Sequence, residues 1–293
     1  MIKIEFMKMN GAGNDFVMID GRSLPDSGLT KDIIHRICDR RRGAGADGLI
    51  IIKPSDRADF EMEYYNADGG PGSLCGNGAR AAIKFAKMKN YFEGKSTRFV
   101  VNGVYYKGEY IDENLMQFFA GNPGKTKLDF RIKAAAQLIN SHFADTGSPH
   151  AVIEIKDILQ NPKDPRSGFT DISEIPVYEL GKEIRFSKDF APGGLNVNFI
   201  QIKDEGIFVR TYERGVEDET LACGTGSIAS AIVANLKYKL PSPVTIFTRG
   251  GDTLKVEFEK KDGIPADIRL SGPAEINYTG IFEINNNLKS EKE

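Results

Sequence analysis

Two cysteines stand in nearly the same local sequence, and their pattern points to acid/base chemistry. Cys75-Gly-Asn-Gly and Cys223-Gly-Thr-Gly lie about half the chain apart, and each precedes a largely apolar run with helical spacing. The first N–H groups of a helix lack internal partners, and the helix dipole favours negative charge there. Glycines at such a start let a ligand approach the backbone closely. We therefore predict, in each half, an activated thiol beside an anion-binding helix start.

The pair is more informative than either motif alone, because a single buried cysteine is usually a small apolar filler. Epimerising an α-carbon without a cofactor requires one group to remove a proton and another to return one to the opposite face. Two groups of similar pKa suit this task, one as thiolate and one as thiol. Two helix starts near one carboxylate would also stabilise the charge that develops as the proton leaves. Cys75 and Cys223 are thus the predicted catalytic pair.

Composition limits the classes of function. A chain of 293 residues suits two domains of about 150 residues. The net charge of −2 gives no reason to expect nucleic acid or anionic lipid as a partner. The opening residues lack the apolar core of a signal peptide, and no apolar run reaches the length of a membrane span. We expect a cytoplasmic protein with no membrane or nucleic-acid partner.

The cysteine and histidine content argues against other cysteine chemistry. The three cysteines form no C-x-x-C pair, and there are only three histidines, so neither a disulfide framework nor a metal site is expected. Cys38 lies on the apolar side of a predicted helix, 31–42, and is assigned to the core. His35 is expected at or near the surface, and Asp68 is interpreted as a turn residue.

Most of the chain has the pattern of short strands separated by turns. Asn102-Gly103 between two such runs predicts a tight hairpin, and the Gly/Pro-rich stretch 121–127 predicts a domain boundary. A helix is also predicted at 177–186. Strands are predicted at 2–7, 16–20, 49–53, 60–65, 98–101, 104–110, 113–119, 151–155, 197–202, 207–212, 244–248, 254–258 and 267–270. The helices after the two cysteines are apolar enough to be surrounded by protein. The expected fold is α+β, with two pseudo-symmetric domains, each a curved mixed sheet around a central helix.

Several segments together resemble the diaminopimelate epimerase family over almost the whole chain. They include Lys8–Phe16, Asn66-Ala-Asp-Gly, Cys75–Arg80, Gly147–His150, Asn196-Val197, Glu213-Arg214-Gly215 and Glu219–Gly226. The resemblance implies an isomerase that interconverts LL- and meso-diaminopimelate without a cofactor, in lysine and peptidoglycan precursor biosynthesis. It also implies a small amino acid as ligand, and it allows for a homodimer.

The resemblance also implies roles for individual residues. Gly76, Asn77, Gly224 and Thr225 would hold the carboxylate at the reacting centre. Asn66, Asn196 and Arg214 would bind the far end of the substrate, with the Arg214 fork on its carboxylate. Asn14 would contact the substrate, Glu213 would accept from its ammonium, and His150 and Glu213 would adjust the thiol pKa values. The expected domains are 1–121, completed by a strand at about 274–284, and 122–273, with a polar tail at 285–293.

Two departures from the family pattern stand out. Ser148 replaces the asparagine that usually precedes Pro-His, so a direct substrate contact there would be lost or mediated by water. The loop between Arg214 and Glu219 is one residue longer than the common form and lacks its second glycine.

Three rival functions remain open from the sequence. One is another cysteine-pair racemase of the same fold, acting on proline-like or other amino acids. A second, from a different class, is a thiol redox protein, and a third is a metal-binding protein. The sequence after Cys75 and the Glu213-Arg214 pair favour a substrate with two amino-acid ends over the first rival, while the absence of a C-x-x-C pair and the scarcity of histidine weigh against the other two.

Overall fold

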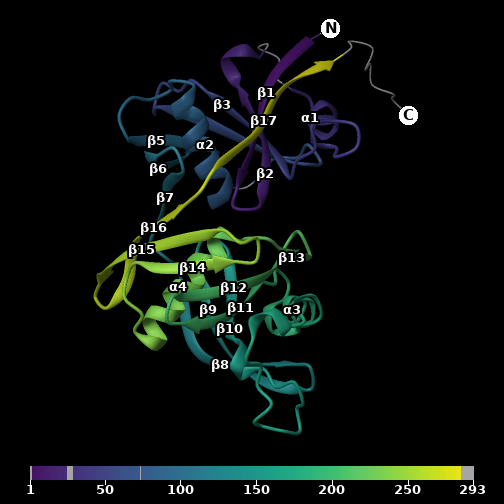
Figure 1. Cartoon of the computed structure of the whole chain (residues 1–293), viewed down its shortest axis with the longest axis vertical. Helices are drawn as coiled ribbons and strands as arrows, with labels where there is room; N and C mark the ends of the chain where they lie inside the picture. Colours follow the sequence, from purple (N-terminus) through teal and green to yellow (C-terminus); the bar gives the residue numbers. More distant parts are fainter. Residues whose placement is uncertain (1, 25–28, 73, 285–293) are drawn as a thin grey trace. The chain divides into compact units, whose positions relative to one another are not determined.

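The computed structural model describes residues 2–24, 29–72 and 74–284 (Figure 1). The expected polar tail, 285–293, lies outside the described residues. The chain forms two compact units, Met1–Phe118 with Pro273–Glu293 (unit 1) and Phe119–Gly272 (unit 2). Unit 1 therefore takes up the C-terminal strand β17 (Glu275–Ile284), which pairs antiparallel with β1 (Ile2–Gly11). None of the helices described is both long and apolar enough to span a membrane.

Unit 1 is a mixed sheet in the order β17–β1–β2–β3–β4–β5–β6. Two neighbouring pairs, β2/β3 and β4/β5, are parallel, and parallel strands need a crossover connection. Helices α1 (Lys31–Cys38) and α2 (Gly76–Met88) supply these crossovers. The remaining strands are β2 (Asn14–Asp20), β3 (Gly48–Lys53), β4 (Phe60–Asn66), β5 (Ser96–Val101), β6 (Val104–Asp112) and β7 (Leu115–Gly121).

Unit 2 repeats this arrangement in the order β8–β9–β10–β11–β12–β14–β15–β16. Its parallel pairs are β10/β11, bridged by α3 (Val177–Arg185), and β12/β14, bridged by α4 (Gly224–Tyr238). The strands are β8 (Thr126–Ala134), β9 (Gln137–Asp145), β10 (Pro149–Glu154), β11 (Asn196–Lys203), β12 (Gly206–Glu213), β13 (Asp218–Thr220), β14 (Val244–Thr248), β15 (Thr253–Lys261) and β16 (Ile264–Gly272). Short 3₁₀ helices occupy Gly21–Ser23, Ile155–Asp157, Ile172–Glu174 and Lys188–Phe190.

The helix that follows each motif cysteine is the central element of its unit. Ten of the thirteen residues of α2 are buried, and eleven of the fifteen residues of α4. Helix α2 contacts β1, β2, β3 and β6, while α4 contacts every strand from β9 to β16 except β13. The expected α+β fold, with two similar domains wrapped around central helices, is confirmed.

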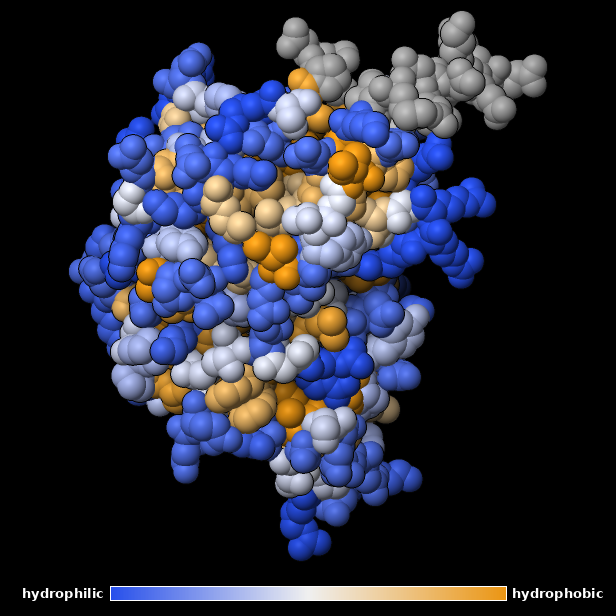
Figure 2. Space-filling model, turned by 45° about the horizontal axis from the view of Figure 1, so that its top comes forward, coloured by the Kyte–Doolittle hydropathy of each residue, from blue (hydrophilic) through white to orange (hydrophobic). Residues whose placement is uncertain are grey.

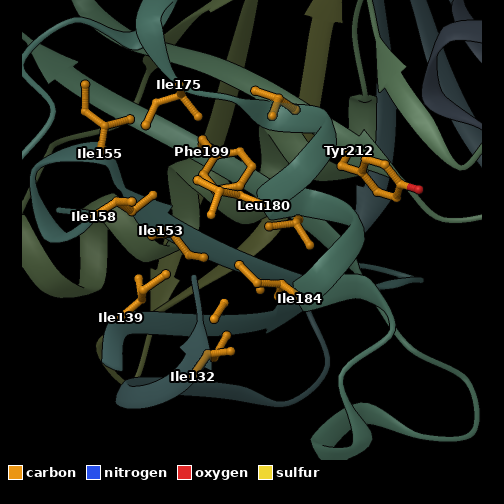
Figure 3. Close-up of a cluster of buried hydrophobic side chains, with 14 of the residues drawn as sticks. Ile132, Ile139, Ile153, Ile155, Ile158, Ile175, Leu180, Ile184, Phe199 and Tyr212 are labelled. Carbon is orange, nitrogen blue, oxygen red and sulfur yellow. The ribbon is translucent and has the colours of Figure 1, made fainter. Parts of the chain in front are cut away.

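The outer face of the unit 2 sheet carries a second core beneath α3. In Figure 3, Leu180 and Ile184 of α3 point toward Ile153 and Phe199 on neighbouring strands. The helix packs closely because Gly181 has no side chain: a Cβ there would lie 2.3 Å from Tyr212 Cβ. Strands β10 and β11 are therefore covered on both faces, and nearly all residues of β10 and the first five of β11 are buried.

Two sequence predictions of local structure were wrong. The helix expected at 31–42 ends at Cys38, because the Asp39 carboxylate accepts the backbone N–H groups of Arg41 and Arg42 and turns the chain. Strands β8 and β9 were not predicted at all. Their hairpin turns at Ala135-Ala136, where both residues have positive φ, 48° and 56°, without the usual asparagine or glycine.

Candidate active site

The predicted site residues of unit 1 lie at one edge of its sheet. Strands β2 and β3 begin at this edge and β4 ends there, since Gly48 pairs with both Phe16 and Asn66. The end of β1 also lies there, because a Cβ on Gly11 would come within 2.5 Å of the Asn77 carbonyl oxygen. The sheet edge therefore meets the first turn of α2, which contains Gly76 and Asn77.

Cys75 is the residue that caps α2. Its backbone is extended (φ −116°, ψ 148°), and its Sγ accepts from the N–H of Gly78 at 3.2 Å. The thiol is half-buried, and the first turn carries no acidic residue. An unopposed helix dipole and a backbone N–H donor both favour the thiolate form of a cysteine.

A chain of hydrogen bonds fixes the two asparagines of this half-site. The Asn77 amide donates to Asn14 Oδ1 at 2.6 Å, and the Asn14 amide donates to Asp47 at 3.1 Å. Arg80, fully buried, donates to Asn77 Oδ1 at 2.9 Å and also to the carbonyl oxygens of Gly11 and Gly76. Asn77 and Asn14 are thereby brought together in one orientation beside the helix start.

Charged groups next to Asn14 hold that end of the network. Asp15 pairs with Lys8 at 2.7 Å and with Arg40 at 2.7 Å, and Arg40 also pairs with Asp47 at 2.7 Å. Burial alone would raise the pKa of Asp15, but the bonds from Arg40 and Lys8 outweigh it and lower the pKa to about 2. The Asp15 carboxylate is therefore ionised, and its ion pairs anchor the loop that carries Asn14.

Asn66 lies at the end of β4, in an exposed turn. Its amide donates to the Pro71 carbonyl at 3.3 Å, and its backbone bonds close the turn to Gly69 and Gly70. Asp68 accepts from the N–H of Gly70, which confirms it as a turn residue. Asn66 belongs to the same sheet edge as Asn14, but no hydrogen bond joins it to Cys75 or Asn77 among the residues described.

Unit 2 builds an equivalent half-site at the corresponding edge of its sheet. Cys223 caps α4 with an extended backbone (φ −123°, ψ 112°), and its Sγ accepts from the N–H of Gly226 at 3.4 Å. The first turn of α4 again has no acidic residue, and Cys223 is 7% exposed. Thr225 Oγ1 lies 3.5 Å from Cys223 Sγ. All three cysteines of the chain are reduced thiols, and Cys38 is buried in the core as predicted.

The strand ends of unit 2 place the remaining predicted residues beside this helix start. Asn196 begins β11 and pairs in register with His150 on β10. Its Oδ1 accepts the backbone N–H of Arg214 at 2.9 Å, while Glu213 accepts from the Thr220 hydroxyl at 2.8 Å. The Arg214 side chain is exposed, and within the described ranges its guanidinium has no hydrogen-bond or ion-pair partner. The guanidinium can thus donate hydrogen bonds to a ligand carboxylate.

His150 is fully buried and neutral. Burial is the main reason that the pKa of its imidazole is lowered to about 3, and the nearby positive charge of Arg214 acts in the same direction. Its Nε2 lies 2.9 Å from Ser148 Oγ, which in turn donates to Thr225 Oγ1 at 3.3 Å. His150 is therefore connected to Cys223 through the hydroxyl groups of Ser148 and Thr225.

Several residues of these networks were missed from the sequence. Arg80, Asp47, Asn198 and Thr211 each hold a predicted site residue or its neighbour. Asn198 had a recognisable signal, since it lies two positions after Asn196 and so faces the same side of the strand. Arg80 is the one arginine inside a largely apolar helix. Asp47 and Thr211 had no local signal, because their partners are remote in sequence.

A cavity of about 300 Å³ lies elsewhere in unit 2, lined by residues that include Phe208, Phe247 and Arg210. Arg210 is already bonded to both carboxylate oxygens of Glu219 and to three carbonyl oxygens, so its positive charge is compensated within unit 2. Figure 2 shows polar and charged residues over most of the face in view, with apolar residues in scattered patches. The helix starts at Cys75 and Cys223 remain the best-supported candidate sites, one in each unit.

Comparisons with known proteins identify the family to which the sequence belongs. The model of the family "Diaminopimelate epimerase" matches residues 6–123 and 142–269. A diaminopimelate epimerase of Chlorobaculum tepidum is 40% identical, covering 94% of this chain and 100% of the relative. One of Aquifex aeolicus is 37% identical, covering 88% of this chain and 91% of that protein.

Solved structures share the fold at low sequence identity. A Bacillus anthracis protein of the PhzF phenazine biosynthesis family superimposes with a TM-score of 0.69 at 13% identity, covering 97% of this chain and 100% of that one. A hydroxyproline epimerase of Agrobacterium vitis gives a TM-score of 0.68 at 14% identity, covering 98% and 94%. By its sequence, the chain belongs to the diaminopimelate epimerase family of isomerases.

Proposed function

We propose that the chain interconverts LL- and meso-diaminopimelate without a cofactor, with Cys75 and Cys223 as a two-base pair. The observation that carries this proposal is the matched position of the two thiols. Each caps the central helix of its unit, and each accepts from the backbone N–H three residues later. The relatives named diaminopimelate epimerase support the same substrate.

The proton balance of the proposed reaction is simple. One cysteine, as thiolate, removes the α-proton and becomes a thiol, while the other, as thiol, gives its proton to the opposite face and becomes a thiolate. The reaction therefore needs both thiols to reach one α-carbon in the substrate complex. The negative charge that develops would be stabilised by the N–H groups at Gly76-Asn77 and Gly224-Thr225. The reverse reaction exchanges the two roles.

The second amino-acid end of the substrate accounts for the polar strand ends. A buried carboxylate needs a charged partner, and the planar fork of Arg214 can supply two parallel bonds. Asn66 and Asn196 would bind the remaining polar atoms at that end, and Glu213 would accept from its ammonium. Asn196 already bonds the backbone of Arg214, so the two act as one local structure.

The direct test is to follow LL-diaminopimelate by circular dichroism with purified protein, EDTA and no added cofactor. We expect conversion to an equilibrium mixture with the meso isomer, and no racemisation of L-proline or trans-4-hydroxy-L-proline. Loss of optical rotation with proline but not with diaminopimelate would assign the protein to the rival racemase function. No turnover of any of these amino acids would refute the proposal.

A further inference from the structure

The hydrogen bonds around Asn198 determine which nitrogen of His150 carries its proton. Asn198 Oδ1 accepts from the Thr211 hydroxyl at 2.9 Å, and Asn198 Nδ2 donates to the Ala151 carbonyl at 2.9 Å. A carbonyl can only accept, so the amide cannot be turned the other way. The same Nδ2 lies 3.0 Å from His150 Nδ1, which must therefore accept. The proton of the neutral imidazole is on Nε2.

The Ser148 hydroxyl oxygen accepts two hydrogen bonds, one of them from His150. His150 Nε2 donates to Ser148 Oγ at 2.9 Å, and Asn196 Nδ2 donates to it at 3.4 Å. The Asn196 amide is also fixed, since it donates to the Pro149 carbonyl. A hydroxyl has two acceptor sites and a single proton. With both acceptor sites used, the Ser148 proton goes to Thr225 Oγ1 at 3.3 Å.

Thr225 completes the sequence of donors. Its hydroxyl accepts from Ser148, so its own proton is available to an acceptor, and Cys223 Sγ lies 3.5 Å away. The same sulfur accepts from the N–H of Gly226 at 3.4 Å. In unit 1 the residue in the place of Thr225 is Asn77, whose amide bonds Asn14 and Arg80 instead.

We infer that Ser148 and Thr225 form a one-directional hydrogen-bond relay that donates to Cys223 and stabilises its thiolate, with His150 and Asn198 setting the direction. This inference deepens the proposed function, since it rests on Cys223 acting as an acid and base. Ser148 and His150 are positioning residues here, because they act through Thr225. The titratable or charged groups beside the relay are His150 on β10 and Glu213 and Arg214 at the end of β12.

The relay gives the serine at position 148 a role of its own. Asparagine, the usual family residue there, has an amide in place of a single rotating hydroxyl. Ser148 instead passes on one proton whose direction its neighbours fix. The relay also assigns His150 a role that needs no protonation, which agrees with its burial.

The test measures the thiolate of Cys223 directly, in the full-length protein with Cys75→Ser, by the pH dependence of iodoacetamide alkylation and peptide mass spectrometry. We expect Ser148→Ala and Thr225→Val each to slow alkylation of Cys223 at pH 7 about 3- to 10-fold, as the thiolate loses a hydrogen-bond donor. The titration of the thiol should move to higher pH. Thr225→Ser, which keeps the hydroxyl, should behave like the parent.

Matched controls separate the relay from general disturbance. Ser141→Ala removes another buried serine of unit 2, outside the relay, and should leave alkylation of Cys223 unchanged. In a Cys223→Ser protein, Ser148→Ala should leave alkylation of Cys75 unchanged. Equal slowing at both cysteines would overturn the relay, as would an unchanged Cys223 in Ser148→Ala.

A further outcome would assign the Thr225 hydroxyl a different role from the one in the relay. If Thr225→Val raises KM while Cys223 alkylation stays at the parent rate, the hydroxyl serves the substrate carboxylate and the relay is wrong. Because alkylation needs no turnover, the relay and the proposed function fail separately. If the protein epimerises none of these amino acids, but Ser148→Ala still slows alkylation of Cys223, the proposed function is wrong and the relay stands.

Discussion

At the scale of single residues, the two motif cysteines are distinguished from the third by their surroundings. Cys75 and Cys223 each face a helix start and accept a backbone N–H. Cys38 lies in the core of unit 1 among isoleucines, and its burial raises the pKa of its thiol to about 12. The same side chain is thus a candidate acid/base group in two places and an apolar filler in the third.

This contrast predicts the outcome of three alanine substitutions. Cys75→Ala and Cys223→Ala should each reduce epimerisation at least about 1,000-fold with the fold intact, because each removes one of two obligatory proton carriers. Cys38→Ala should retain turnover and lose only about 1–2 kcal/mol of stability through packing. Initial rates and urea unfolding of the three variants check this. Near-normal turnover by either motif variant would contradict the assignment.

In the proposed function, Arg214 decides the choice of substrate. Lysine lacks the far carboxylate, so it should leave the Arg214 fork without a partner and be used about 30- to several-thousand-fold less efficiently, corresponding to roughly 2–5 kcal/mol. Arg214→Ala should lose a similar factor with diaminopimelate, and Arg214→Lys should not restore it. Arg249→Ala, which removes an arginine from the neighbouring Glu219 cluster, is the matched control. Equal use of lysine and diaminopimelate by the parent would exclude this role.

The sequence predicted which residues line the two half-sites better than it predicted what holds them. Asn14, Asn77, His150 and Asn196 all lie beside the helix starts, and local motifs were enough to select them. Asp47, which accepts from Asn14, precedes β3, and Thr211, which donates to Asn198, lies on β12; neither belongs to a motif. A contact between residues distant in sequence depends on the register of the sheet, which a single sequence does not reveal.

At the scale of elements, close packing sets the start of α4. A Cβ on Gly226 would lie 2.2 Å from Asn198 Oδ1, so Gly226→Ala must displace the amide or the helix start. We expect a loss of about 1–3 kcal/mol in unfolding free energy together with slower turnover. Gly193→Ala is the control, because its nearest neighbour would be 3.9 Å away. A Gly226→Ala protein as stable and as active as the parent would disprove the close contact.

The two hairpins show what local sequence can and cannot predict about an element. Asn102-Gly103 turns β5 into β6 with φ values of 50° and 78°, and these residue types favour such angles, so the hairpin was predicted correctly. Ala135-Ala136 adopts a similar turn between β8 and β9 with residues that disfavour it. There the sheet must impose the turn, since Ile132 and Ile139 are both buried in the core beneath α3.

At the scale of the whole molecule, the chain is two copies of one topology. In both units the third and fifth neighbouring pairs of the sheet order are parallel and are connected through a helix, and the second of these helices follows the motif cysteine. Equivalent topology puts chemically equivalent thiols at equivalent strand edges. The Cys-Gly-x-Gly repeat predicted this symmetry, although the intervening strands have diverged beyond recognition.

The buried histidine makes global stability depend on pH in a defined window. A histidine in an unfolded chain binds a proton near pH 6.5, whereas folded His150 does so only near pH 3. Between these values the unfolded state holds more protons, so stability falls as pH decreases below 6.5. From pH 7 to pH 5 we expect a loss of about 2 kcal/mol from this residue.

Urea unfolding at pH 7, 6 and 5 measures this loss. Asp15, whose folded pKa is about 2, changes the free energy of unfolding only below about pH 4, outside the range from pH 7 to pH 5. His150→Gln should flatten the dependence, although His142, whose pKa burial also lowers, keeps a part of it. The exposed His35→Gln is the control and should follow the parent. Identical slopes for parent and His150→Gln would show that His150 is not held neutral.

The most direct test of the central claim, that two different groups carry the proton, is the fate of hydrogen at the inverted α-carbon in D2O. With LL-diaminopimelate and parent enzyme, analysed by mass spectrometry early in the reaction, two bases predict product that carries one deuterium and remaining substrate that carries none. The abstracted proton stays on one thiol while the other thiol, exchanged with solvent, delivers deuterium. Product that retains protium, or substrate that gains deuterium before inversion, would mean that a single base serves both faces and would contradict the pairing of Cys75 with Cys223.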